Sequence, residues 1–99
     1  MSKLYVTEYM DMGVAAGFIP IAKEPALVEQ APIAISGTHA ESAAFGPNTR
    51  FIRVHTDVIC SIVFGDAPVA TTSHKRLAAN QTEYFGVAPQ QKLSVIANT

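Results

Sequence analysis

The chain has no tryptophan, a single cysteine and few charged side chains, and each of these shortages narrows what it can do. One cysteine excludes a disulfide within the chain, and because Cys60 lies in an apolar run, we expect a buried and unreactive thiol. The net charge is −1 and the only adjacent basic residues are Lys75 and Arg76, so no basic surface follows a phosphate backbone. We therefore expect no nucleic-acid partner.

Long apolar runs are also missing. No segment approaches the roughly 20 consecutive apolar residues of a membrane-spanning helix, so we expect no membrane partner. The first residues alternate between polar and apolar side chains and do not form the continuous apolar segment of a signal peptide. These features predict a protein made in a reducing cytoplasm.

The residue patterns that support catalysis are absent as well. The chain has no Gly-x-Ser-x-Gly, no Gly-x-Gly-x-x-Gly and no Walker pattern, and its carboxylates are scattered. His55 and Asp57 share one strand face, and His39 or His74 could join them, but no metal-ligand spacing connects these residues. We expect a non-enzymatic protein with no catalytic residue, no cofactor site and no metal site.

What the chain does contain is a series of short runs rich in β-branched and aromatic residues, separated by Gly, Pro, Asn and Asp. The clearest run, at residues 51–57, places Ile52, Val54 and Thr56 on one face, which we expect to face the core. The apolar phase of the other strong strands predicts that Ile62, Phe64, Phe85, Leu93 and Val95 are buried as well. The fold class is therefore predicted to be all-β, a single small β-sandwich or jelly-roll-like domain without a helix. The spacing predicts about eight short strands, at residues 3–9, 26–29, 33–36, 42–45, 51–57, 58–64, 83–87 and 92–97, with loops at 10–17 and 69–79.

Residues 1–22 are expected to form an N-terminal strand and a flexible arm, ahead of a β-sandwich domain at residues 23–99. Both faces of the first strand carry bulky side chains, which predicts that a neighbouring subunit covers one of them. Only 15% of residues are charged, so the surface suits contact between subunits, and we expect a homo-oligomer or self-contacts. The candidate interface residues are Tyr5, Val6, Tyr9, Phe18 and Ile19.

Aromatic residues suggest an alternative, a small carbohydrate-binding module. Tyr5, Tyr9, Tyr84 and Phe85 would stack on a saccharide if an exposed sheet face presented them. Aromatic residues in a small β domain more often fill the core or an interface, and the chain lacks tryptophan. Sugar binding therefore remains the alternative from a different functional class.

Residues 42–98 contain a series of blocks whose order is more specific than any single block. The blocks are SAAF at 42–45, TRFIRVHTD at 49–57, CSI at 60–62, FG at 64–65, Pro68 with AT at 70–71, LAANQTEYFGV at 77–87 and KLSVIA at 92–97. In this order they resemble small proteins encoded among the virion genes of tailed bacteriophages. The chain looks most like the capsid cement or decoration proteins, which are small β-rich folds, some of them jelly rolls.

The resemblance implies a non-enzymatic structural protein that binds the outer capsid surface and stabilises the head. Its partner would be the major capsid protein, and its location the exterior of the virion after synthesis in the host cytoplasm. A neck, tail or fibre protein is the alternative within the virion. Copy number separates these roles, because a cement protein is present in hundreds of copies and a neck or tail protein in few.

Overall fold

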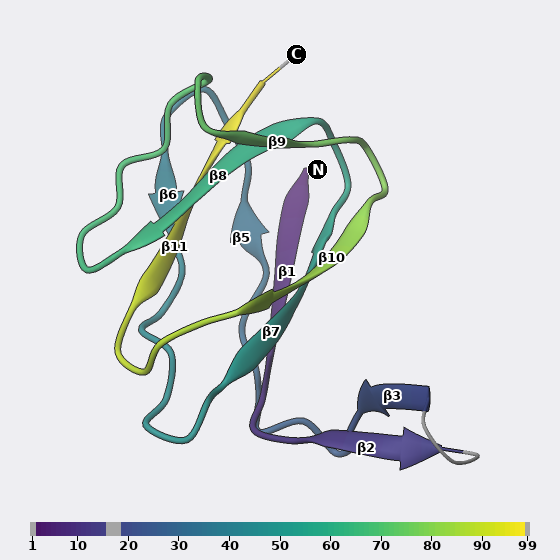
Figure 1. Cartoon of the computed structure of the whole chain (residues 1–99). Helices are drawn as coiled ribbons and strands as arrows, with labels where there is room; N and C mark the ends of the chain where they lie inside the picture. The colour runs from purple at the N-terminus through teal and green to yellow at the C-terminus, as the bar shows by residue number, and fades with distance from the viewer. Residues whose placement is uncertain (1, 16–18, 99) are drawn as a thin grey trace.

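The structure is a computed structural model that describes residues 2–15 and 19–98, and within these ranges it is all-β with no helix (Figure 1). Two antiparallel sheets pack against each other, as in a small β-sandwich, and a separate two-stranded ribbon extends from one end. The predicted fold class is thereby confirmed. The described residues contain no helix long and apolar enough to cross a membrane.

The first sheet has five strands, and the earliest strand of the chain lies inside it. β1 (Lys3–Tyr9) is hydrogen-bonded to β7 (Phe51–Thr56) on one side and to β4 (Val28–Glu29) and β5 (Ile33–Ala34) on the other. β10 (Thr82–Gly86) pairs with the far side of β7 and forms the sheet edge. Residues 3–9 are therefore an inner strand of the sandwich. This corrects the expectation that residues 1–22 form an arm separate from a domain at 23–99.

The second sheet has four strands, in the order β6 (Ala40–Glu41), β11 (Lys92–Ala97), β8 (Cys60–Gly65) and β9 (Lys75–Leu77). β9 lies within residues 69–79, which were expected to be a loop, because only Leu77 of this short edge strand is buried. The strand predicted at 42–45 is also displaced, since the paired residues are those of β6. Residues 42–45 nevertheless lie alongside β11. Backbone hydrogen bonds join Ser42 N to Leu93 O at 2.7 Å and Phe45 N to Gln91 O at 2.8 Å.

The core lies between the two sheets. As predicted from their strand phase, Ile52, Val54, Ile62, Leu93 and Val95 are buried. Leu4 and Val6 of β1 and Phe45 complete the space between the sheets. Phe64 and Phe85, also expected in the core, are only partly buried and pack against its margin, with their ring centroids 5.2 Å apart.

A buried carboxylate sits beside this core. Glu8 of β1 is only 2% exposed, and its side chain accepts three hydrogen bonds from two other segments of the chain. Oε1 accepts from Gly46 N at 2.9 Å and from Thr49 Oγ1 at 2.6 Å, and Oε2 accepts from Gln30 Nε2 at 2.8 Å. Hydrogen bonding of this kind offsets the cost of removing a carboxylate from water. Glu8 thus ties the Gly46–Thr49 turn and residue 30 to the middle of the first sheet.

The ribbon consists of β2 (Met12–Ala15) and β3 (Ile19–Ala22), which pair only with each other. It follows β1 directly and extends away from both sheets (Figure 1). Residues 10–17 were expected to be a loop, so β2 is a further correction. The chain returns to the sandwich where Lys23 N donates to Asp11 O at 3.2 Å, which closes the base of the ribbon.

The buried position of Leu93 predicts that Leu93→Ala will lower the free energy of unfolding by about 2–5 kcal/mol, because the truncation removes apolar contacts and leaves a cavity. Urea denaturation measures this loss. Val69 is 55% exposed and serves as the control, with an expected change for Val69→Ala within about 0.5 kcal/mol. Equal effects for the two variants would contradict the described core.

The hydrogen bonds to Glu8 generate a second prediction. Glu8→Gln keeps the size of the side chain but turns amide hydrogens toward groups that are themselves donors. We expect the free energy of unfolding at neutral pH to fall by about 1–3 kcal/mol, since buried donors lose their acceptor. Glu29→Gln is the matched control, because Glu29 is exposed. An unchanged urea midpoint for Glu8→Gln would show that the carboxylate does not join these segments.

Candidate functional site

The outer face of the five-stranded sheet carries the main concentration of polar and aromatic side chains. Alternation along β1 and β7 turns Val6 and Val54 inward and leaves Thr7, Arg53 and His55 facing outward. The strand register then places residues of different strands at one level. Glu29, Thr7, Arg53 and Tyr84 form one such row, and Tyr5, His55 and Thr82 form the next.

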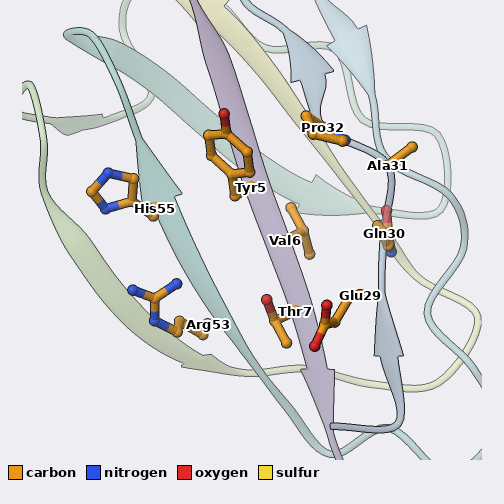
Figure 2. Close-up of a pocket in the computed structure, with 9 residues that line it drawn as sticks. All are labelled: Tyr5, Val6, Thr7, Glu29, Gln30, Ala31, Pro32, Arg53 and His55. Atoms are coloured by element: carbon orange, nitrogen blue, oxygen red, sulfur yellow. The ribbon is translucent and has the colours of Figure 1, made fainter.

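Part of these two rows borders a shallow hollow of about 600 Å³, whose lining does not include Tyr84 and Thr82 of β10. Tyr5, Thr7, Arg53 and His55 contribute from β1 and β7, while residues 29–32 form the opposite wall. In Figure 2 the side chains of Tyr5, His55 and Arg53 stand along one side of β1 and β7, with Glu29 and Pro32 on the other side. The hollow is open to solvent, so it can accommodate a surface ligand.

The polar groups of the hollow are held in different ways. His55 Nδ1 lies 2.8 Å from Thr82 Oγ1, and this hydrogen bond leaves Nε2 as the ring nitrogen that can bond to another partner. The rings of Tyr5 and His55 are tilted, with centroids 6.3 Å apart. Arg53 forms no ion pair within residues 2–15 and 19–98, where the single ion pair joins Lys92 and Glu41. Its guanidinium is therefore available to an anionic group.

The four aromatic residues that were candidates for stacking on a sugar divide into an exposed pair and a pair that is not presented to solvent. Tyr5 is 39% exposed and Tyr84 is 54% exposed, and both lie on the outer face. Tyr9 is instead buried at 4% exposure and stacks on Phe51, with centroids 5.2 Å apart. Phe85 points to the opposite side of the sheet, where the Lys75 ammonium lies 5.0 Å from its ring centroid. Only Tyr5 and Tyr84 are thus presented to solvent.

Tyr9 is fixed by a hydrogen bond at the base of the ribbon. Its hydroxyl donates to Glu24 Oε2 at 2.6 Å. This hydrogen bond, together with burial and the negative charge of Glu24, raises the pKa of Tyr9 to about 12. The buried phenol therefore links β1 to the segment that follows β3.

A second surface of interest lies around the ribbon base. Met10 and Leu27 are 39% and 45% exposed there, and Ile21 at the end of β3 is 47% exposed. Met10, Leu27 and Pro25 border a small hollow of about 150 Å³ that also contains Asp11, Lys23 and Glu24. No pattern in the sequence marks Met10, Ile21 or Leu27 as surface residues, because their exposure depends on where the ribbon leaves the sandwich.

The five candidate interface residues have different outcomes. Tyr5 is exposed and remains available to a partner. Val6 and Tyr9 are buried within their own chain, at 1% and 4% exposure, which corrects the expectation that they face a neighbour. Their strand lies inside the sheet, and other residues of this same chain cover both side chains. Phe18 lies outside the described residues, and Ile19 is placed in β3 without a described side chain.

The histidine and aspartate side chains that were considered as metal ligands are separated from one another and bond to other groups. Asp57 Oδ2 accepts from the backbone N of Lys3 at 3.2 Å, and His39 Nδ1 lies 3.3 Å from Ser94 Oγ. In the part of the chain that the structure describes, no three His, Cys, Asp or Glu residues come together as they would around a metal ion. Burial raises the pKa of the Cys60 thiol, against a smaller opposing effect of its hydrogen bond to Thr56.

No family model, no curated protein and no solved structure matches the chain. Its class, a small all-β sandwich with an added ribbon, is therefore assigned from its own geometry.

The raised pKa of Tyr9 predicts how its contribution to stability depends on pH. An unfolded tyrosine has a pKa of about 10, so the stabilisation is fully present below that pH and is lost as the pH rises through about 12. Tyr9→Phe should therefore be less stable than the wild type at pH 7, by about 1 kcal/mol. The difference in urea midpoint should shrink between pH 10 and pH 12. A difference that stays constant over this range would contradict the assigned hydrogen bond.

Proposed function

We propose that this protein is a non-enzymatic structural component of a tailed-bacteriophage virion, which binds the outer surface of the capsid and stabilises the head. Its partner is the major capsid protein, it assembles on the exterior of the virion, and it is made in the host cytoplasm. The observation that carries the proposal is the β2–β3 ribbon, which stands away from the sandwich on which it is built.

The composition of the ribbon argues for a protein partner. Residues 12–22 read MGVAAGFIPIA and contain no charged or hydrogen-bonding side chain. Neither strand pairs with either sheet, and an isolated two-stranded ribbon is marginally stable in water. A segment with this composition gains free energy when apolar surface from another molecule covers it.

The surface next to the ribbon extends the same apolar character. Met10, Ile21, Leu27 and Val28 are between 39% and 47% exposed, which is unusual for large apolar side chains in one part of a small domain. Docking the ribbon between capsid subunits would bury these residues as well. Each docked copy would then restrain the subunits that it bridges. Many symmetric copies would together stabilise the shell even if each one binds with modest affinity.

The sequence adds two supports to this proposal. The blocks of residues 42–98 resemble phage decoration proteins, and the low charge of 15% suits a surface shared with other subunits. A neck, tail or fibre role uses the same kind of fold, and the two roles differ in stoichiometry. Copies of the chain on the capsid are also expected to contact one another.

The ribbon can be removed without disturbing the sandwich, which gives a direct test. Because Lys23 N and Asp11 O are hydrogen-bonded, residues 12–22 can be replaced by Asn-Gly, a dipeptide that forms tight hairpin turns. We expect this variant to fold but to bind at least about tenfold more weakly to heads of the major capsid protein encoded in the same genome, a loss of about 1.4 kcal/mol. Co-sedimentation with purified heads measures the binding.

Two point variants control for the deletion. Ile21→Glu places a charge on the ribbon, whereas Val69→Glu places the same charge on an equally exposed residue in the loop between β8 and β9. The first should lose binding and the second should retain it, with similar melting temperatures for both. Wild-type binding by the ribbon variants, or no binding by the wild type, would refute the proposal.

A further inference from the structure

The outer face of the five-stranded sheet lies on different strands from the ribbon and has a different chemical character. Where the ribbon is apolar and uncharged, the outer face combines exposed aromatic rings with an arginine, a histidine and a carboxylate. An inference about this face therefore does not rest on the capsid proposal. Its chemistry identifies a second ligand.

Two exposed tyrosines define the size of that ligand. Tyr5 and Tyr84 lie two strands apart and one two-residue step apart along the strands. With strand spacings near 4.8 Å and a rise near 3.4 Å per residue, their positions on the sheet are on the order of 12 Å apart. Aromatic side chains attached to the sheet at this separation suit an oligosaccharide of two or three sugar units, in which different units pack against the two rings.

The side chains that lie between Tyr5 and Tyr84 determine which charge the ligand should carry. Arg53 lies between Thr7 and Tyr84 in one row, and His55 lies between Tyr5 and Thr82 in the next. The guanidinium presents donors in a planar fork that matches a carboxylate, and no ion pair within the described ranges occupies it. His55 keeps Nε2 for a further hydrogen bond, because Thr82 holds Nδ1.

The opposite wall supplies acceptors for hydroxyl groups. Glu29 is exposed and lies beside Thr7 in the strand register, so Thr7 separates it from Arg53. A sugar ring over Thr7 would have a carboxylate acceptor on one side and a guanidinium donor on the other.

From these contacts we infer that the hollow bordered by Tyr5, Arg53, His55 and Glu29 binds a carboxylate-bearing saccharide (Figure 2). The carboxylate of the sugar faces Arg53 and His55. Its hydroxyl groups face Thr7 and Glu29, and neighbouring sugar units stack on Tyr5 and Tyr84. Affinity is modest, since the hollow is shallow and open, and repeated copies would strengthen attachment to a glycan-coated surface.

Matched pairs of sugars test the inference on the whole chain. Sialyllactose and lactose differ by one acidic sugar, and trigalacturonic acid and its methyl ester differ by carboxylate charge. Titration of each into isotopically labelled protein, followed by NMR, should shift the signals of residues 5–7, 53–55 and 84 with at least one acidic probe. The neutral member of that pair should bind at least tenfold more weakly. A glycan array extends the search to other acidic sugars.

Substitutions assign the binding to the hollow. Arg53→Gln and Tyr84→Ala should each weaken the acidic probe at least fivefold, and Arg53→Lys should lose part of the binding because it keeps the charge without the planar fork. Arg76→Gln removes an exposed arginine from β9 of the other sheet and should bind as the wild type does. Melting temperatures confirm that the variants are folded.

Three results would overturn the inference. The first is an array and titrations in which no acidic saccharide binds. The second is equal binding of the neutral and acidic members of each pair, which removes the role of Arg53. The third is signal shifts confined to residues outside the hollow. Each of these leaves the capsid proposal standing, because capsid binding is measured on heads with ribbon variants.

Discussion

The structure depends on the placement of β1 at the centre of the first sheet, held there by the buried carboxylate of Glu8. The strand is hydrogen-bonded along both edges, and Glu8 adds bonds to Gln30 and to the turn that contains Thr49. These partners come from segments between about a fifth and two fifths of the chain length away, so the sandwich forms only when distant segments meet. Because β2 follows β1 directly along the chain, this anchorage fixes the point at which the ribbon leaves the sandwich.

The sequence predicted most clearly where alternation is strong. The strands at 3–9 and 92–97 have the predicted bounds, and the inward phase of Ile52 and Val54 is confirmed. What alternation could not supply is the partner of each strand, and so the strand at 3–9 was grouped with an N-terminal arm outside the domain, although it lies inside a sheet. β9 was missed because an edge strand with one buried residue, Leu77, has the polar composition of a loop.

The same limit applies to the candidate surfaces. The phase of residues 51–57 placed Arg53 and His55 on an outer face, and Tyr5 and Tyr84 were recognised as aromatic candidates. The convergence of Tyr5, Arg53 and His55 around one hollow, with Tyr84 on the neighbouring strand, depends on register, which no local pattern contains. The burial of Tyr9 depends likewise on a partner fifteen residues away, the carboxylate of Glu24. The apolar ribbon and the polar outer face lie on different elements, so the proposed capsid contact and the proposed saccharide site do not compete for one surface.

The most direct test of the proposed capsid-binding role is a cryo-electron microscopy reconstruction of the virion whose genome encodes the chain. The account predicts density for the sandwich on the outside of the head, in hundreds of copies related by the symmetry of the shell. Residues 12–22 should be buried between capsid subunits, and the outer face with Arg53 should be accessible to solvent. A copy number near twelve, a location at the neck or tail, or a ribbon exposed to solvent would contradict it.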